Sequence, residues 1–264
     1  MALTVSGVSK TFAASDGGAV HALDDVSLEV REGEFVSIIG PSGCGKSTLF
    51  QIIGGLLTAD RGAVQVNGKA LNGAPRDIGM VFQEESTFPW RTVLDNVAFP
   101  LELAGLGKGE REDKARHFIR LVGLDGFERK FPDELSGGMR QRTAIARTLA
   151  FQPSILLMDE PFASLDEQTR ILLGDKILQI WRELKQTTLL ITHNITEAVQ
   201  LSDRVAVMTY RPGRIKRFIE IDLPRPRSSE IIASAEFGRY VGLLWQDLRE
   251  EATRGMADSE RKAG

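Results

Sequence analysis

The chain has 264 residues and a mass of 29.1 kDa, with 42% hydrophobic, 26% charged and 7% aromatic residues. This is the composition of an ordinary globular protein, so a disordered or collagen-like chain is excluded. Because 33 Lys and Arg stand against 36 Asp and Glu, the net charge is −3 and gives no general attraction to nucleic acid or anionic lipid.

The cysteine content indicates a reducing compartment. Cys44 is the single cysteine, so no disulfide within the chain is expected. The N-terminus shows no basic stretch followed by an apolar core, and no apolar run approaches the ~20 residues that span a bilayer as a helix. We therefore expect a cytoplasmic protein that reaches a membrane only through a partner.

The first half of the chain begins with β-rich segments and continues into a helical one. Short apolar runs bounded by turns predict strands over residues 3–8, 26–30, 35–39, 64–66 and 78–82, with a helix over residues 46–54. From about residue 93 to residue 150, apolar residues recur at helical spacing, for example Val93, Val97 and Leu101.

The second half alternates strands with helices. Strands are predicted over residues 155–158, 188–191, 205–209 and 214–221, and helices over residues 167–184 and 196–202. This alternation predicts an α/β fold with a parallel sheet, interrupted by a mainly helical insertion.

The C-terminal part is predicted to be a linker followed by a helix. Residues 224–227, Pro-Arg-Pro-Arg, are expected to form a stiff polar linker. The helix has one apolar face, formed by Phe237, Val241, Leu244, Trp245 and Leu248. It could dock a regulator, close a dimer or cover the core, and covering the core is the commonest use of such a face. The last dozen residues are expected to be a solvated tail.

A glycine-rich loop between the strand at 35–39 and the helix at 46–54 is the strongest motif. It fits the P-loop pattern G-x-x-x-x-G-K-[ST] and consists of Gly40, Pro41, Ser42, Gly43, Cys44, Gly45, Lys46, Ser47 and Thr48. Its glycines let backbone N–H groups and the helix N-terminus face phosphate oxygens. Lys46 is predicted to reach the β- and γ-phosphates, Ser47 to ligate Mg²⁺ and Thr48 to bond phosphate. A loop without a ligand is the alternative, which the complete motif in this context disfavours.

Two acids, Asp159 and Glu160, follow the apolar run at 155–158. At the C-terminal edge of a buried strand they lie where α/β sheets bind ligands. Asp159 is predicted to hold Mg²⁺ through water, and Glu160 to orient or deprotonate the water that attacks the γ-phosphate. Without the P-loop, a solvated strand end would be an equally good interpretation.

The class of P-loop protein is decided by the run Leu135-Ser136-Gly137-Gly138-Met139-Arg140-Gln141-Arg142. With it the chain resembles the ATP-binding cassette (ABC) family over about residues 3–222, and five motifs occur in that family's order. The resemblance implies a P-loop NTPase (RecA-like) core with a mainly parallel sheet, an antiparallel β N-terminal part and a helical signature subdomain at about residues 88–144. Ser136, Gly137 and Gly138 would then face the γ-phosphate bound by a second subunit, so that two copies sandwich two nucleotides. An ordinary helix N-cap at Ser136 is the alternative.

Further residues take roles only through this resemblance. Gln83 corresponds to the glutamine that senses Mg²⁺ and the attacking water, and His193 to the switch histidine that contacts the γ-phosphate. Ser164-Leu165-Asp166 resembles the loop that crosses the dimer interface, although Asp166 could equally cap the following helix. Phe12 occupies the place of the aromatic that stacks on adenine, with a core phenylalanine as the alternative.

The resemblance also implies coupling to a membrane protein. In bacterial importers of the family, the region of residues 88–93 receives a short helix of the permease. Trp90 would suit an interface anchor there, unless it packs within the helical insertion. The stretches at 210–215 and 222–226 are similar to those of the nitrate/sulfonate/taurine branch of importer ATPases.

The expected protein is an ATPase that uses ATP and Mg²⁺ at the cytoplasmic face of the cell membrane and powers the import of a small solute. Its expected partners are permease subunits, a second copy of itself and, indirectly, a periplasmic or lipid-anchored solute-binding protein, with no nucleic acid. Residues 1–222 would form the ATPase domain, and residues 223–264 the linker and C-terminal helix. The main alternative is the ATPase of a lipid-trafficking or other non-importer complex. Translation ATPases with tandem cassettes and chromosome ATPases with coiled coils fit less well, since one cassette and no sustained heptads are found.

Overall fold

The computed structural model describes residues 1–13, 17–84, 86–163 and 165–263. The chain divides into two compact units, a first unit of Met1–Pro75 with Thr187–Gly264 and a second unit of Arg76–Gln186. Each unit combines strands with helices, and the α/β class predicted from the sequence is confirmed.

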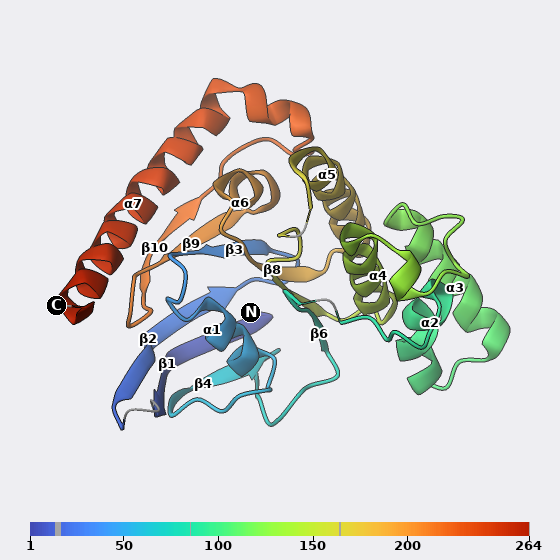
Figure 1. Cartoon of the computed structure of the whole chain (residues 1–264), viewed down its shortest axis with the longest axis horizontal. Helices are drawn as coiled ribbons and strands as arrows, with labels where there is room; N and C mark the ends of the chain where they lie inside the picture. The colour runs from blue at the N-terminus through green and yellow to red at the C-terminus, as the bar shows by residue number, and fades with distance from the viewer. Residues whose placement is uncertain (14–16, 85, 164, 264) are drawn as a thin grey trace. The chain divides into compact units, whose positions relative to one another are not determined.

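The first unit contains an antiparallel sheet with the strand order β2-β1-β4-β5 (Figure 1). Its strands are β1 (Leu3–Ala13), β2 (Ala19–Val30), β4 (Arg61–Val66) and β5 (Lys69–Ala70). The strands β1 and β2 are longer than the sequence predicts. Thr11 pairs with His21 and Phe12 with Val20, so backbone pairing continues where the side chains no longer alternate between apolar and polar.

The first unit also contains strands that pair mostly in parallel. β3 (Phe35–Ile39) lies between β8 (Thr187–Ile191) and β9 (Arg204–Met208), parallel to both, and β10 (Ile215–Glu220) joins β9 antiparallel. Every residue of β3 and β8 is buried, as expected of continuous apolar strands within a parallel sheet. The helices of this unit are α1 (Lys46–Ile53), α6 (Ile195–Leu201) and α7 (Ala235–Ala263), with a short 3₁₀ helix over Ser229–Ala233.

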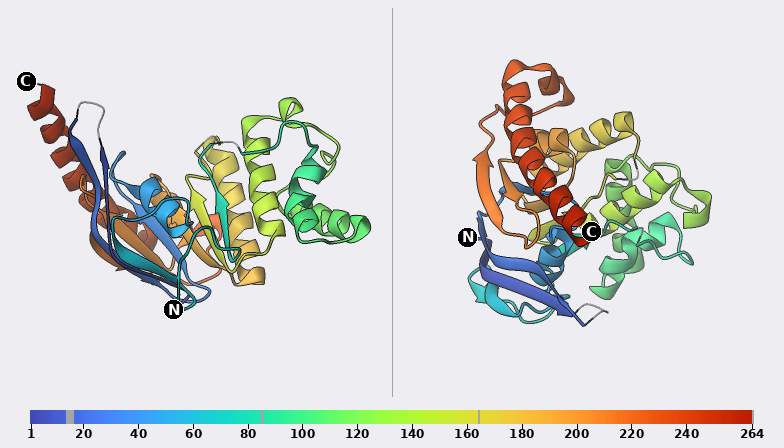
Figure 2. Two further views of the ribbon diagram at one scale, coloured as in Figure 1. Left: turned by 90° about the horizontal axis from the view of Figure 1, so that it is seen from below. Right: turned by 60° about the vertical axis from the view of Figure 1, so that its left-hand side comes forward.

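The second unit contains the helical insertion. β6 (Ile78–Val81) pairs in parallel with β7 (Ile155–Asp159), and α5 (Glu167–Leu184) follows β7. Between these strands lie α2 (Val93–Leu103), α3 (Lys108–Leu121), a 3₁₀ turn (Pro132–Glu134) and α4 (Gly137–Ala150). The three α-helices pack against one another, drawn in green in Figure 2.

The C-terminal segment differs from the prediction in two respects. The helix α7 continues to Ala263, so the residues expected to form a solvated tail are helical. Its Phe237, Tyr240 and Leu244 are buried against α6 and β9, which confirms that this helix covers the core of the first unit. The spacing predicts Trp245 on the same face, but this side chain is 61% exposed, because the buried stripe of the helix passes through Tyr240 instead.

Within residues 224–227, the two prolines are exposed, whereas the two arginines are held by the rest of the first unit. Arg225 forms an ion pair with Asp203 at 2.6 Å. Arg227 is only 3% exposed, and its guanidinium donates to the carbonyl oxygens of Ile221, Leu223 and Ser202. Burial lowers the pKa of Arg227 to about 10, so it is protonated at neutral pH. The two arginines therefore fasten the chain between β10 and α7.

Replacing Arg227 by Ala is expected to lower the free energy of unfolding by about 2 kcal/mol, because several buried carbonyl oxygens lose their donor. Urea denaturation measures this loss. Arg225→Ala is the matched control, and since it removes a partly exposed ion pair with Asp203 and a single bond to the carbonyl oxygen of Leu201, it is expected to cost less. Equal midpoints for Arg227→Ala and the wild type would show that the guanidinium does not hold this segment.

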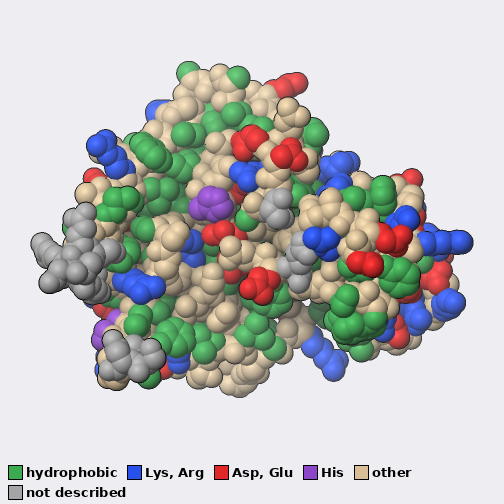
Figure 3. Space-filling view, viewed as in Figure 1, with side chains coloured by type: hydrophobic (Ala, Val, Ile, Leu, Met, Phe, Trp, Pro, Cys, Tyr) green, Lys and Arg blue, Asp and Glu red, His purple; other side chains and the backbone are tan. Residues whose placement is uncertain are grey.

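In the part of the chain that the structure describes, no helix is both long and apolar enough to cross a bilayer. Acidic, basic and hydrophobic side chains are interspersed over the face drawn in Figure 3, in agreement with the nearly balanced charge of the sequence.

Candidate nucleotide-binding site

The P-loop predicted at residues 40–48 connects β3 to α1 in the first unit. Gly43 and Gly45 adopt left-handed backbone conformations, with φ of 73° and 102°. A Cβ atom on Gly45 would lie 2.7 Å from the carbonyl oxygen of Ala22, so this position has room only for glycine. The loop therefore has the glycine-dependent backbone turns that let successive N–H groups surround a phosphate.

Lys46 lies at the start of α1 with its ammonium group directed into the loop. Its Nζ atom donates to the carbonyl oxygens of Gly40 at 2.8 Å and of Pro41 at 3.0 Å, and the residue is 7% exposed. The helix begins at Lys46, directly after Gly45. The N–H groups of its first turn, including those of Ser47 and Thr48, therefore have no acceptor within the helix. A cation and a helix N-terminus thus meet at one loop, which suits an anion such as phosphate.

Cys44 is fully buried inside the P-loop. Burial raises the pKa of its thiol, although the nearby Lys46 ammonium opposes this shift. A buried thiol with a raised pKa is a poor nucleophile, so Cys44 serves as a small packing residue of the loop.

The two acids at the end of β7 occupy different environments in the second unit. Asp159 is the last residue of β7 and is buried, whereas Glu160 is partly exposed. The backbone of Glu160 is left-handed, with φ of 47°, a conformation that is uncommon outside glycine and often marks a functional position. The side-chain amide of Gln83 donates to Oε2 of Glu160 at 3.3 Å. The structure therefore brings together the predicted glutamine and the predicted base.

The helix α4 supports the segment that carries Gln83. The amide of Gln141 donates to the carbonyl oxygen of Phe82 at 3.3 Å, and the Thr148 hydroxyl to that of Met80 at 3.2 Å. No role for either residue is predicted from the sequence. Gln141 stands shortly after the Leu-Ser-Gly-Gly residues, but no local pattern shows that its side chain reaches Phe82, 59 positions earlier in the chain.

The signature residues lie at the N-terminus of α4. Ser136 caps this helix by accepting a hydrogen bond from the N–H of Met139 at 3.3 Å, so the N-cap interpretation is confirmed. A Cβ on Gly138 would lie 2.6 Å from the Cδ2 atom of Leu165, so a larger residue here would require this leucine side chain to move. The phosphate contacts implied for Ser136, Gly137 and Gly138 remain predictions.

Asp166 is the N-cap of α5. Its carboxylate accepts a hydrogen bond from the N–H of Thr169 at 2.9 Å, and this bond lowers the pKa of Asp166. The capping interpretation is thus confirmed, and a second role at a dimer interface stays a prediction. Ser164 lies outside the described residues.

His193 follows β8 in the first unit, and its ring is exposed. The Thr192 hydroxyl donates to Glu197 at 2.5 Å and accepts the N–H of Asn194 at 3.0 Å. Asn194 in turn caps α6 through the N–H of Glu197. These bonds fix the backbone on either side of His193. The Asn-x-x-Glu spacing of a capping box was a signal for them in the sequence.

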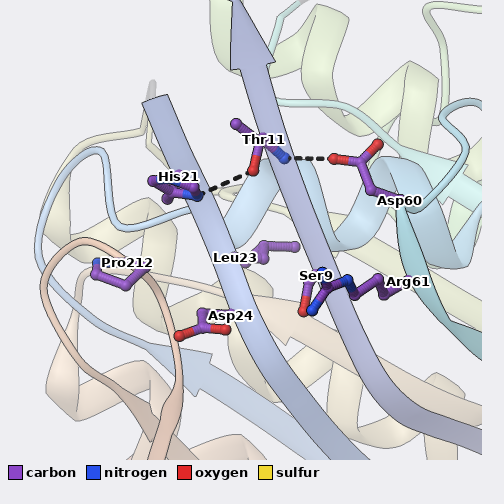
Figure 4. Close-up of a pocket in the computed structure, with 8 residues that line it drawn as sticks. All are labelled: Ser9, Thr11, His21, Leu23, Asp24, Asp60, Arg61 and Pro212. Atoms are coloured by element: carbon purple, nitrogen blue, oxygen red, sulfur yellow. Dashed lines mark hydrogen bonds between the residues drawn. The ribbon is translucent and has the colours of Figure 1, made fainter. Parts of the chain in front are cut away.

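Phe12 lies in β1 and is 39% exposed, which contradicts the alternative of a core phenylalanine. The Lys10 ammonium lies 5.7 Å from the centre of its ring. The neighbouring Thr11 lines a pocket of about 530 Å³ and bonds both His21 and Asp60 (Figure 4). An exposed ring is available for stacking, and its contact with adenine remains a prediction.

Oxygen donors suited to Mg²⁺ are present in both units. They are the Ser47 hydroxyl, the Asp159 carboxylate and the amide oxygen of Gln83. The described residues contain no group of three or more His, Cys, Asp or Glu that could hold a metal by themselves. Each of these oxygens is of the kind that Mg²⁺ takes beside phosphates and waters, and their meeting at one ion stays a prediction.

Comparison with known proteins identifies the family. The family model described as ABC transporter matches residues 23–163. An uncharacterized ABC transporter ATP-binding protein of Methanocaldococcus jannaschii is 50% identical over 254 residues, 96% of this chain and 94% of that protein. The nitrate import ATP-binding protein of Synechocystis sp. is 44% identical over 259 residues, 96% of this chain and 97% of that protein.

A taurine import ATP-binding protein of Rhizobium johnstonii is 47% identical over 223 residues, which are 84% of this chain and 85% of that protein. Among solved structures, a dimeric ATP-binding cassette in a post-hydrolysis state, bound to ADP and Pi, matches with a TM-score of 0.77 and 33% identity. That match covers 84% of this chain and 100% of the other. The chain, with its P-loop, signature run and strand-end acids, belongs to the ABC transporter family.

Proposed function

We propose that two copies of the chain close around two ATP molecules and hydrolyse them. The hydrogen bond between Gln83 and Glu160 at the end of β7 is the observation that carries this proposal. It joins a partly exposed carboxylate to an amide that holds it in place, next to the buried Asp159. The dimeric relative bound to ADP and Pi supports the arrangement of two copies.

Each predicted residue then has a defined task. Lys46 and the N–H groups of the P-loop bind the phosphates, while Glu160 accepts a proton from the attacking water and Gln83 orients both. His193 contacts the γ-phosphate, and Phe12 stacks on the adenine. Ser136, Gly137 and Gly138 of the second copy close the site. When bound, Mg²⁺ neutralises phosphate charge, with Ser47 and Asp159 as the side chains that would hold it.

We further propose that hydrolysis powers a permease that imports a small solute of the nitrate, sulfonate or taurine type. The relatives named as nitrate and taurine import proteins support this solute class. The permease would bring the protein to the cytoplasmic face of the membrane, where a solute-binding protein acts from the other side. Residues 1–222 would form the cassette and residues 223–264 a C-terminal extension.

Trp90 offers a contact for the permease. The side chain is 71% exposed in the turn before α2, so it is not packed within the helical insertion. Phe88 supports it, with ring centres 5.6 Å apart, and is itself held by Phe99 at 4.8 Å and by the guanidinium of Arg147. An exposed tryptophan on a rigid aromatic base is typical of an interface hot spot.

The test is to purify the tagged protein from its native membranes in mild detergent and to identify the chains that accompany it. We expect a polytopic permease and a solute receptor, and we expect Trp90→Ala to lose the permease while still binding ATP. Leu56→Ala, which removes another exposed apolar side chain, is the matched control and should retain it. Ribosomal or DNA-associated partners without a permease would overturn the transport proposal, and a permease without a solute receptor would overturn the import direction.

A further inference from the structure

The loop of residues 209–214 between β9 and β10 touches the P-loop at two consecutive residues. The Nε atom of Arg211 donates to the carbonyl oxygen of Gly43 at 2.6 Å. A Cβ atom on Gly213 would overlap the carbonyl oxygen of Cys44, so the two backbones are in direct contact. Two successive peptide units of the P-loop are thus held from outside the phosphate-binding turn.

The same loop is anchored to β2. Gly213 donates its N–H to Ala22 at 2.9 Å and accepts the N–H of Asp24 at 3.0 Å. Figure 4 shows Pro212 beside this strand. Since Ala22 also lies against Gly45, the strand and the loop enclose the P-loop between them.

On its other side the loop is held by α7. The N–H of Tyr210 donates to Oε2 of Glu251 at 3.1 Å, and Glu251 is 1% exposed. A Cβ on Gly255, one turn further along α7, would lie 2.8 Å from the ring of Tyr210. Lys216 lies 3.2 Å from Glu251 and completes the junction. Through Glu251 and Gly255, the C-terminal helix thus contacts the loop that holds the P-loop.

Arg211 and Arg214 differ in what they bind. Arg214 forms an ion pair with Asp24, whereas in the described part of the chain Arg211 makes no ion pair and donates only to Gly43. Because the C=O of Gly43 and the N–H of Cys44 belong to one planar peptide unit, holding this oxygen also fixes the direction of that N–H. The N–H of Cys44 now bonds Pro41 at 3.3 Å, on the inner side of the loop.

We propose that Arg211 is a positioning residue for nucleotide binding, which fixes the Gly43–Cys44 peptide unit of the P-loop, and that α7 sets its place through Glu251. A preorganised cradle binds phosphate without first having to order its own N–H groups. This inference rests on the proposed phosphate-binding role of the P-loop. It assigns a task to the Arg-Pro-Gly run and to the C-terminal helix.

The experiment compares Arg211→Ala with Arg214→Ala in the full-length protein, using titration with a fluorescent ATP analogue in the presence of Mg²⁺. We expect Arg211→Ala to raise the Kd about three- to tenfold, with kcat at saturating ATP within about twofold of wild type. Arg211→Lys is expected to recover part of the affinity. Amide hydrogen exchange should be faster in the P-loop of Arg211→Ala and unchanged in Arg214→Ala.

Two results would overturn the assignment of Arg211. One is a wild-type Kd and wild-type P-loop exchange in Arg211→Ala, and the other is an equal loss of affinity in both variants, which would show a merely structural loop. If the wild-type protein failed to bind the nucleotide at all, the proposed phosphate site itself would be wrong. This result differs from the two above, in which the wild type binds and only the role of Arg211 is overturned.

The link to α7 is tested by Glu251→Ala against Glu250→Ala, since Glu250 lies on the same helix but is half exposed and, among the described residues, bonds Lys216 alone. We expect Glu251→Ala to raise the Kd, and the double variant with Arg211→Ala to bind no more weakly than Arg211→Ala alone. Gly255→Ala, which presses a methyl group against Tyr210, should act in the same direction even if Glu251→Ala does not fold. Wild-type affinity in a folded Glu251→Ala or in Gly255→Ala would overturn this link.

Discussion

Glu160→Gln is expected to lower ATP turnover by about a hundredfold or more while nucleotide binding persists. The substitution keeps the size of the side chain and its hydrogen bonding toward Gln83, 3.3 Å away in the structure, but removes the carboxylate that would take a proton from water. Phosphate release at saturating Mg-ATP measures turnover, and titration with a nucleotide analogue measures binding.

Glu167→Gln is the matched control for this variant. Glu167 is an exposed glutamate in the first turn of α5 that pairs with Arg170 at 3.3 Å and has no proposed role in hydrolysis, so its loss should leave turnover near that of the wild type. If Glu160→Gln hydrolysed ATP as fast as the wild type, the assignment of Glu160 as the base would be wrong.

Lys46→Ala is expected to weaken ATP binding by roughly ten- to a hundredfold, the usual cost of losing hydrogen bonds to a charged group. In the structure the ammonium sits inside the loop, bonded to the carbonyl oxygens of Gly40 and Pro41. It is the loop's own cation, and the helix N-terminus alone offers only partial charge. Nucleotide titration measures the loss.

Lys69→Ala provides the control for the lysine variant, because Lys69 is an exposed residue of β5 outside the P-loop. Circular dichroism should show that both variants are folded. A folded Lys46→Ala protein with wild-type affinity would contradict the phosphate-binding role of the loop.

The sequence predicts the structure well where the boundaries of a strand or helix are set by residues that are neighbours in the chain. The strand at 35–39 and the helix at 167–184 agree residue for residue with β3 and α5, because an apolar run bounded by Gly33 and Gly40 and a helix capped by Asp166 carry their own boundaries. The P-loop was predicted for the same reason, since its glycines, lysine and hydroxyl residues are consecutive.

The parts that could not be predicted depend on distant contacts. The sequence predicts that Arg227 belongs to a polar linker. Only the tertiary structure shows that its guanidinium bonds the carbonyl groups of residues 202 and 221. Trp245 fits the apolar stripe of α7 by spacing alone, and only packing shows that Tyr240 takes its place in the core. The left-handed backbone of Glu160 and the contact of Arg211 with Gly43 are likewise set by tertiary structure.

ATP is expected to close two copies of the chain around shared sites, and light scattering of Glu160→Gln after size-exclusion chromatography measures this closure. Because this variant should bind ATP without hydrolysing it, we expect a dimer in Mg-ATP and a monomer in Mg-ADP. A monomer in Mg-ATP, at concentrations where titration shows the nucleotide to be bound, would show that ATP does not join the two copies.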